Sequence, residues 1–142
     1  MGRYSGMIDF NRRLLFIHIA RTGGTSIETA CAGIDWCCID LPSKHLSAAQ
    51  TRARYGEEIW NSFTKFTIVR NPWDRLVSMW STGSWHSEQD GEACRDMKAF
   101  LAQLKPHPIE KYQSLFYHEI LDEPLDYVLR YESLRDDLLR ML

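Results

Sequence analysis

An apolar run followed by a glycine-containing segment decides the fold. It reads Leu14-Leu15-Phe16-Ile17-His18-Ile19-Ala20-Arg21-Thr22-Gly23-Gly24-Thr25-Ser26. The first six residues are rich in strand formers, and the glycine pair after them is typical of a turn. Residues 27–32 have the composition of a helix, and Gly33 is suited to end it. The sequence therefore predicts a strand, a glycine loop and a helix in succession.

The same order of elements recurs twice. Residues 66–69 predict a strand, and a helix follows to about residue 80, with Asn71 suited to the N-cap and Pro72 to the first helical position. Residues 127–131 predict a third strand, before a helix that begins near residue 133. Strands that alternate with helices predict a parallel sheet covered on both faces. The predicted fold class is α/β, a three-layer P-loop-like fold with a central, mostly parallel sheet.

Further helices are expected between these units. Ser47 and Gln50 fit a capping box that opens a helix toward Tyr55, and Gly56 then breaks it. We also expect helices at residues 97–104 and 109–121, a polar loop at residues 81–94, and a short buried strand around the adjacent cysteines at positions 37 and 38. The strand before the glycine loop places His18 in the core, with its polar atoms satisfied.

Composition narrows the class of protein. The chain has 142 residues with a net charge of -2, which predicts one domain, residues 1–142, and no nucleic-acid binding. Residues 1–75 carry a net charge of +3 and residues 76–142 one of -5, so an anionic ligand is expected in the N-terminal half. There is no apolar run of about 20 residues, and the four cysteines lack metal-site spacing. We expect reduced thiols, no metal and a cytoplasmic location.

The glycine loop has the groups that an anion needs. Its glycines bring backbone N–H groups close to a ligand, the hydroxyls of Thr22, Thr25 and Ser26 are donors, and the next helix presents its positive end. Arg21 adds a full charge. The loop lacks the lysine of the nucleoside-triphosphatase pattern, and no strand ends in a clear magnesium-binding aspartate. These absences disfavour a small-molecule kinase and are compatible with transfer of the less charged sulfuryl group.

Three segments resemble the sulfotransferases that use 3′-phosphoadenosine 5′-phosphosulfate (PAPS). Residues 16–26 are similar to the 5′-phosphosulfate loop of that family, residues 65–78 to its 3′-phosphate segment, and residues 129–134 to its later nucleotide-binding motif. Lys44-His45-Leu46-Ser47-Ala48-Ala49 is similar to a segment of the carbohydrate-type members.

The resemblance implies a role for each matching residue. Residues 22–26 (Thr22, Gly23, Gly24, Thr25 and Ser26) and Arg21 would bind the 5′-phosphosulfate, and Arg21 would also act in catalysis by stabilising the leaving phosphate oxygen. Arg70 and Ser78 would bind the 3′-phosphate, and Tyr131 would approach the adenine. His45 would be the general base for a hydroxyl acceptor, which in this branch is a glycan. The other interpretation of His45 is a surface or capping histidine. Arg75 lies beside Ser78 and is expected to pair with an acidic neighbour.

Two departures from the family pattern leave an alternative open. The family loop generally has lysine where this chain has Arg21, and arginine is bulkier and does not release its proton. The chain is also short for the family at its C-terminus, which leaves the site open or closed by a partner chain or a second copy. The main hypothesis is therefore a PAPS-dependent sulfotransferase that releases 3′-phosphoadenosine 5′-phosphate (PAP). The alternative is a degenerate module that binds PAP or PAPS without transfer.

Overall fold

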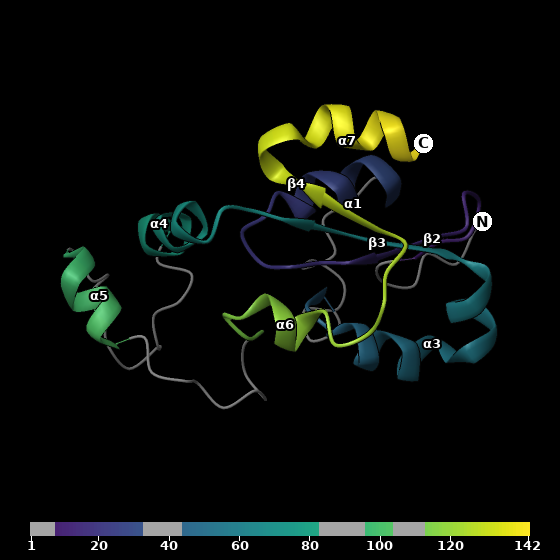
Figure 1. The fold of residues 1–142 in the computed structure, drawn as a ribbon, viewed down its shortest axis with the longest axis horizontal. Helices are drawn as coiled ribbons and strands as arrows, with labels where there is room; N and C mark the ends of the chain where they lie inside the picture. Colours follow the sequence, from purple (N-terminus) through teal and green to yellow (C-terminus); the bar gives the residue numbers. More distant parts are fainter. Residues whose placement is uncertain (1–7, 33–43, 83–95, 104–112) are drawn as a thin grey trace.

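A four-stranded sheet forms the centre of the protein (Figure 1). The computed structural model describes residues 8–32, 44–82, 96–103 and 113–142. Within them the strands are β1 (Ile8–Asp9), β2 (Leu14–Ile17), β3 (Thr64–Val69) and β4 (Tyr127–Arg130), in the order β1-β2-β3-β4. β2, β3 and β4 are parallel, and the short β1 is antiparallel to β2. The predicted mostly parallel α/β sheet is confirmed.

The register of the parallel strands brings their carboxyl ends together. Ile17 is paired with Thr67, and Val69 is paired with Arg130. Because these pairs lie at or near the ends of β2, β3 and β4, the segments that follow the three strands emerge at one edge of the sheet. Ligands of open α/β sheets bind at this edge.

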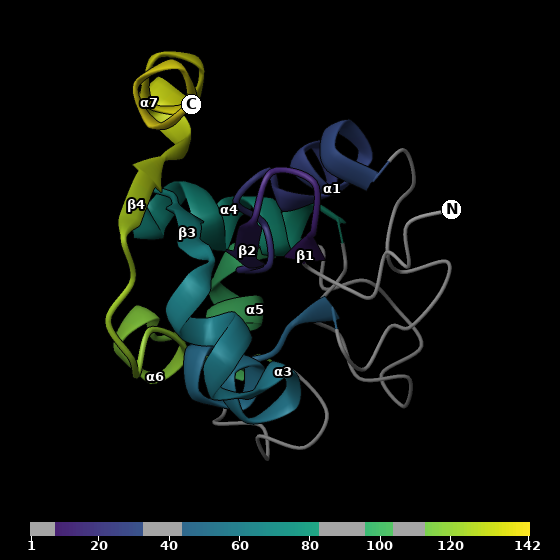
Figure 2. The ribbon, with the colours of Figure 1, turned by 90° about the vertical axis from the view of Figure 1, so that its right-hand side faces the viewer.

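Helices cover both faces of the sheet (Figures 1 and 2). One face carries α1 (Gly24–Ala32) and α7 (Leu134–Met141), which follows the 3₁₀ turn Tyr131–Ser133. The other face carries α3 (Ala48–Ser62) and the single turn α6 (Tyr117–Ile120). Alternation along β2 explains the two layers, because Leu14 and Phe16 pack toward α1 whereas Leu15 and Ile17 pack toward α3.

Two further helices lie beyond the carboxyl end of β3, α4 (Pro72–Thr82) and α5 (Met97–Gln103) (Figure 1). α4 begins as the sequence predicts, because the Asn71 side chain accepts a hydrogen bond from the backbone N–H of Trp73 at 3.0 Å. Pro72 is the first helical residue. The predicted capping box at Ser47 and Gln50 is also confirmed, and Gly56 kinks α3 at φ 84°.

One predicted helix is wrong. Residues 109–121 were expected to form a continuous helix, but among residues 113–121 only Tyr117–Ile120 is helical. The preceding residues use their polar groups in tertiary contacts instead. The Gln113 side chain accepts from the N–H of Ala20 at 2.8 Å, and the carbonyl of Leu115 accepts from Arg75 at 2.8 Å. These long-range bonds replace the local bonds of a helix.

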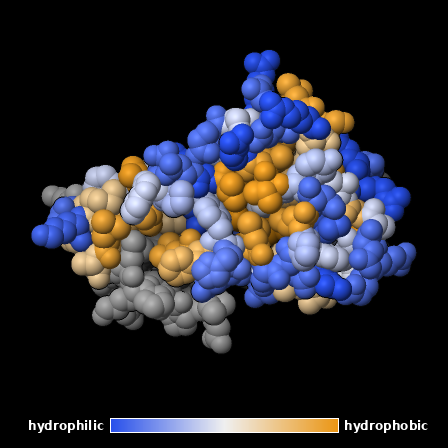
Figure 3. All heavy atoms as spheres, in the orientation of Figure 1, coloured by the Kyte–Doolittle hydropathy of each residue, from blue (hydrophilic) through white to orange (hydrophobic). Residues whose placement is uncertain are grey.

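The surface in Figure 3 has its largest orange region below α7, where β4 forms the outer strand. Tyr127 and Val128 of β4 are exposed. Cys31 of α1 is half-buried and free, and burial raises the pKa of its thiol.

The strand predicted around positions 37 and 38 lies outside the described residues. The loop predicted at 81–94 also lies outside them, apart from its first two residues, which belong to α4. No helix in the described part of the chain has the length and apolarity of a membrane span.

Candidate functional site

The glycine loop, residues 20–26, connects β2 to α1 at the carboxyl edge of the sheet. Both of its glycines are required by their surroundings. Gly23 has φ 84°, and a Cβ there would lie 3.0 Å from the ring of Tyr131. A Cβ on Gly24 would lie 2.3 Å from the ring of His18. The loop therefore folds closely over a buried histidine on one side and against the segment after β4 on the other.

The three hydroxyl residues of this loop have different surroundings. Thr22 is fully buried, and its hydroxyl donates to the carbonyl of Ile19 at 2.7 Å. Its hydroxyl therefore stabilises the loop and does not face a ligand, contrary to the expectation from sequence. Thr25 and Ser26 are exposed in the first turn of α1, where helix N–H groups and the positive end of the helix dipole lie.

Arg21 connects the glycine loop to α4. Its Nε and Nη2 both donate to the hydroxyl of Ser78, at 3.0 and 2.9 Å. Arg21 also has φ 65°, a left-handed conformation that costs a non-glycine residue free energy. Two residues that sequence analysis assigned to separate phosphate sites thus lie in direct contact.

Arg70 follows β3 and reaches the other two segments. Its guanidinium carbon lies 4.4 Å from the centre of the Tyr131 ring, and its Nη1 is 3.5 Å from the carbonyl of Arg21. Its Nε is buried and has no hydrogen-bond partner among the described residues. A buried, unpaired donor is costly, so this atom is suited to binding an anion.

Tyr117 and Arg75 fix the end of β3 and the glycine loop. The hydroxyl of Tyr117 accepts from the N–H of Arg70 at 3.0 Å and donates to its carbonyl at 2.6 Å. Arg75 is buried and donates to the carbonyls of Ala20 and Leu115. Burial lowers its pKa below the usual value for arginine. The prediction that Arg75 pairs with an acidic neighbour is wrong, because its guanidinium donates to two backbone carbonyls and lies over the Tyr117 ring.

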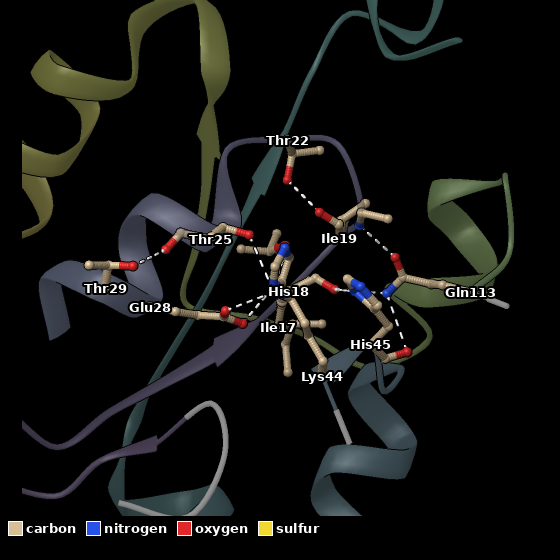
Figure 4. A network of polar contacts seen from close by, with 12 residues as sticks. Ile17, His18, Ile19, Thr22, Thr25, Glu28, Thr29, Lys44, His45 and Gln113 are labelled. Atoms are coloured by element: carbon tan, nitrogen blue, oxygen red, sulfur yellow. Dashed lines mark hydrogen bonds and ion pairs between the residues drawn. The ribbon is translucent and has the colours of Figure 1, made fainter. Parts of the chain in front are cut away.

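His45 lies beside the glycine loop, before α3. Its Nδ1 is 3.3 Å from the carbonyl of His18, so Nδ1 carries the proton and Nε2 keeps its lone pair. Burial, followed by the charges of His18 and Lys44, lowers the pKa of His45 to about 4. The Gln113 side-chain amide donates to the His18 carbonyl at 2.9 Å and thereby ties the segment after α5 to the same edge (Figure 4).

A buried polar cluster lies beneath the glycine loop (Figure 4). The carboxylate of Glu28 in α1 accepts from Nδ1 of His18 at 2.6 Å and from the ammonium of Lys44 at 3.1 Å. Burial raises the pKa of Glu28, but the bonds from His18 and Lys44 outweigh this effect and hold it below its ordinary value. The expectation that His18 is a satisfied core residue is confirmed. Sequence analysis gave Glu28, Lys44 and Gln113 no role.

Comparison with known families shows to which family the chain belongs. A family model described as "Sulfotransferase family" matches residues 7–89, which is more than half of the chain. The chain belongs to the sulfotransferase family. A search of curated proteins and a search of solved structures found no match.

The matched segment of this sulfotransferase contains the glycine loop, Lys44, His45 and the whole of the Arg70–Ser78 segment. Tyr131 lies beyond the match and is placed at the site by its contact with Arg70. Sulfuryl transfer, in general terms, is thus the activity of the protein. No group of three His, Cys, Asp or Glu side chains within residues 8–32, 44–82, 96–103 and 113–142 is arranged to hold a metal ion.

Proposed function

We propose that this sulfotransferase moves the sulfuryl group of PAPS to a hydroxyl of a carbohydrate. The observation that supports this best is the contact of Arg21 with Ser78 and of Arg70 with Tyr131. Residues from three distant segments that resemble PAPS-binding motifs meet at one edge of the sheet. In this scheme residues 1–142 act within one sulfotransferase domain.

Arg70 and Ser78 are suited to the 3′-phosphate, the group that distinguishes PAPS from ATP. Arg70 has an unpaired buried Nε within the described residues, and Ser78 accepts two N–H bonds from Arg21. Because its oxygen already accepts these bonds, the Ser78 hydroxyl is free to donate its own proton to a phosphate oxygen. The exposed ring of Tyr131 offers a surface against which adenine packs.

The glycine loop is suited to the 5′-phosphosulfate. The exposed Thr25 and Ser26 and the first N–H groups of α1 supply neutral donors around one point. The turn at Thr22, Gly23 and Gly24 leads directly into this helix end, and its glycines let it pack against Tyr131 and His18. Hydrogen-bond donors fixed before the reaction stabilise the charge that develops on the leaving phosphate oxygen.

His45 is the general base of this scheme. Nε2 takes the proton of the acceptor hydroxyl as its oxygen attacks sulfur in line with the bond that breaks. The electrons of that sulfur–oxygen bond move to the phosphate oxygen, so that PAP leaves and a sulfate ester forms. The low pKa keeps the imidazole unprotonated at neutral pH, and an anionic donor bound nearby raises that pKa toward a more effective value.

Titration calorimetry with PAP tests donor binding. We expect Arg70→Ala to weaken PAP binding at least tenfold, because a charge-assisted bond to phosphate is lost. Arg52→Ala is the matched control, because Arg52 of α3 pairs with Glu57 of the same helix and with Glu123 before β4, and its removal leaves the site intact. Preference for ATP with magnesium over PAP contradicts the proposal.

Transfer from labelled PAPS to a panel of glycans tests catalysis. We expect a labelled glycan with the unmodified protein. With His45→Asn we expect the rate of transfer to fall by at least about 100-fold, because a general base usually contributes 10²–10⁴ to the rate. PAP binding without any labelled product supports the alternative, a module that binds the nucleotide without transfer.

A further inference from the structure

A buried lysine lies directly beneath the part of the site assigned to the 5′-phosphosulfate. The ammonium of Lys44 is 3.1 Å from Oε2 of Glu28 and 3.3 Å from the hydroxyl of Thr25 (Figure 4). The side chains of Lys44 and Glu28 are only 5% and 4% exposed. Taking two charges out of water is costly, so the position of this pair is held by its own hydrogen bonds.

Glu28 fixes where the ammonium lies. One oxygen of its carboxylate is bound to His18 and the other to Lys44. His18 in turn packs against Gly24, where no other residue fits. The lysine is therefore tied to β2 and α1 by Glu28, and a further N–H of its ammonium points at Thr25.

Thr25 connects this buried charge to the surface. Its hydroxyl oxygen accepts from Lys44, so its own O–H donates in another direction. Thr25 is exposed in the first turn of α1, which is the last part of the glycine loop. A hydroxyl that accepts from a cation is polarised and becomes a stronger donor to an anion.

The side chain of Arg21 is not directed at the first turn of α1. The resemblance assigns its position to the 5′ end of the donor, but its guanidinium is bound to Ser78 on α4. The ammonium of Lys44 is hydrogen-bonded within the first turn of α1, where the phosphosulfate is expected. Positive charge is thus supplied to the two ends of the site by different residues.

We propose that Lys44 is a positioning residue for the 5′-phosphosulfate, which acts by orienting and polarising the hydroxyl of Thr25, while Arg21 serves the 3′-phosphate end. This inference rests on the proposed function, because it takes PAPS as the donor. Lys44 itself does not touch the donor, and its effect passes through one hydroxyl. Removal of the lysine charge and removal of that hydroxyl are therefore expected to weaken the same interaction.

Two nucleotides separate the ends of the site in a binding experiment. PAP has both phosphates, whereas adenosine 3′-monophosphate lacks the 5′ group. We expect the unmodified protein to bind PAP more tightly. The ratio of interest is the dissociation constant of adenosine 3′-monophosphate divided by that of PAP, and we expect it to fall about tenfold in Thr25→Val and in the charge-neutral pair Glu28→Gln/Lys44→Met. Thr25→Ser keeps the hydroxyl and is expected to keep the ratio. Combining Thr25→Val with the charge-neutral pair is expected to add little, because both remove one interaction.

Matched controls separate this effect from general loss of structure. Thr29→Val changes an exposed threonine one turn later in α1, and Lys65→Met removes another paired lysine, at the start of β3. Both are expected to keep the ratio. If the charge-neutral pair does not fold, Lys44→Met alone takes its place, since Glu28 keeps its bond from His18.

The outcomes distinguish the inference from the proposed function. An unchanged ratio in folded Thr25→Val or in a folded Lys44 variant overturns the role of Lys44 and leaves PAPS as donor. Failure of the unmodified protein to bind either nucleotide overturns the proposed function. A fall in the ratio for Thr25→Val with no fall for the Lys44 variants assigns the hydroxyl to the donor and overturns the lysine's part.

Discussion

Two lysine–carboxylate pairs at opposite ends of the sheet have nearly the same geometry. Lys65 and Asp126, at the start of β3, are 2.9 Å apart, and Lys44 and Glu28, at the carboxyl edge, are 3.1 Å apart. Their exposure differs. Asp126 is 45% exposed, whereas both members of the other pair are about as buried as the core.

The difference teaches that distance alone does not measure what an ion pair does. Water screens the Lys65–Asp126 pair, so its contribution to stability is expected to be about 1 kcal/mol or less. The Lys44–Glu28 pair adds little net stability over an apolar pair, but loss of either partner removes the opposite charge from beside a buried charged group. The protein keeps this costly arrangement at the edge where its anionic substrate is expected.

Removal of the carboxylate from each pair is expected to give the largest difference in stability between the two. Glu28→Ala removes the opposite charge beside the buried Lys44 and the carboxylate that binds His18, and is expected to lower the free energy of unfolding by about 3–5 kcal/mol. Asp126→Ala is expected to cost about 1 kcal/mol, because the Asp126 carboxylate is partly exposed and the ammonium of Lys65 keeps its bonds to the carbonyls of Trp60 and Phe63. Urea unfolding of both variants measures the two losses. Equal losses would show that burial does not separate the pairs.

The pH dependence of stability sharpens the same contrast. The pKa of His45 is about 4 in the folded protein and near 6.5 when unfolded, so the unfolded chain binds the proton first as the pH falls. The contribution of a neutral His45 is complete above pH 6.5 and is lost as the pH falls toward 4. Between pH 7 and 5 it amounts to about 2 kcal/mol at most. Glu28, with its lowered pKa, loses its contribution only below about pH 4.5.

Urea midpoints at pH 7 and pH 5 check this expectation in the unmodified protein and in His45→Asn. The variant is expected to lose less stability than the unmodified protein over this interval. Equal pH dependence of the two would mean that His45 is not buried as a neutral ring.

Gly24→Ala tests the packing that supports the buried pair, with a smaller expected effect. The new Cβ would lie 2.3 Å from the His18 ring, which cannot move without leaving Glu28. We expect a loss of about 1–2 kcal/mol in the free energy of unfolding. In a His18→Ala background the same change is expected to cost much less, because the ring is gone. Additive losses would contradict the proposed clash.

Much of the fold could be predicted because it is encoded locally. The apolar runs of β2 and β3, the cap at Asn71 and the break at Gly56 each act within a few residues. The helix expected at residues 109–121 was wrong for the opposite reason. Gln113 and Leu115 bond to residues far away in sequence, and no local pattern shows such bonds.

The candidate site divides in the same way. The glycine loop and the Arg70 segment are continuous motifs, so their residues could be named from sequence. The cluster of His18, Glu28 and Lys44 joins a strand end, a helix and a separate segment. Its one local signal was a glutamate, Glu28, three residues after Thr25, and this spacing does not reveal that the glutamate binds His18 and Lys44.

The phenol of Tyr117 extends the hydrogen bonding of β3 by one residue beyond its carboxyl end. By accepting from the N–H and donating to the carbonyl of one residue, Arg70, it reproduces with a single oxygen what an adjacent strand provides. The strand thus acquires one more rung of its ladder from a side chain. The next backbone N–H, that of Asn71, donates to the Glu132 carboxylate at 2.6 Å, and the guanidinium of Arg70 lies over the Tyr131 ring.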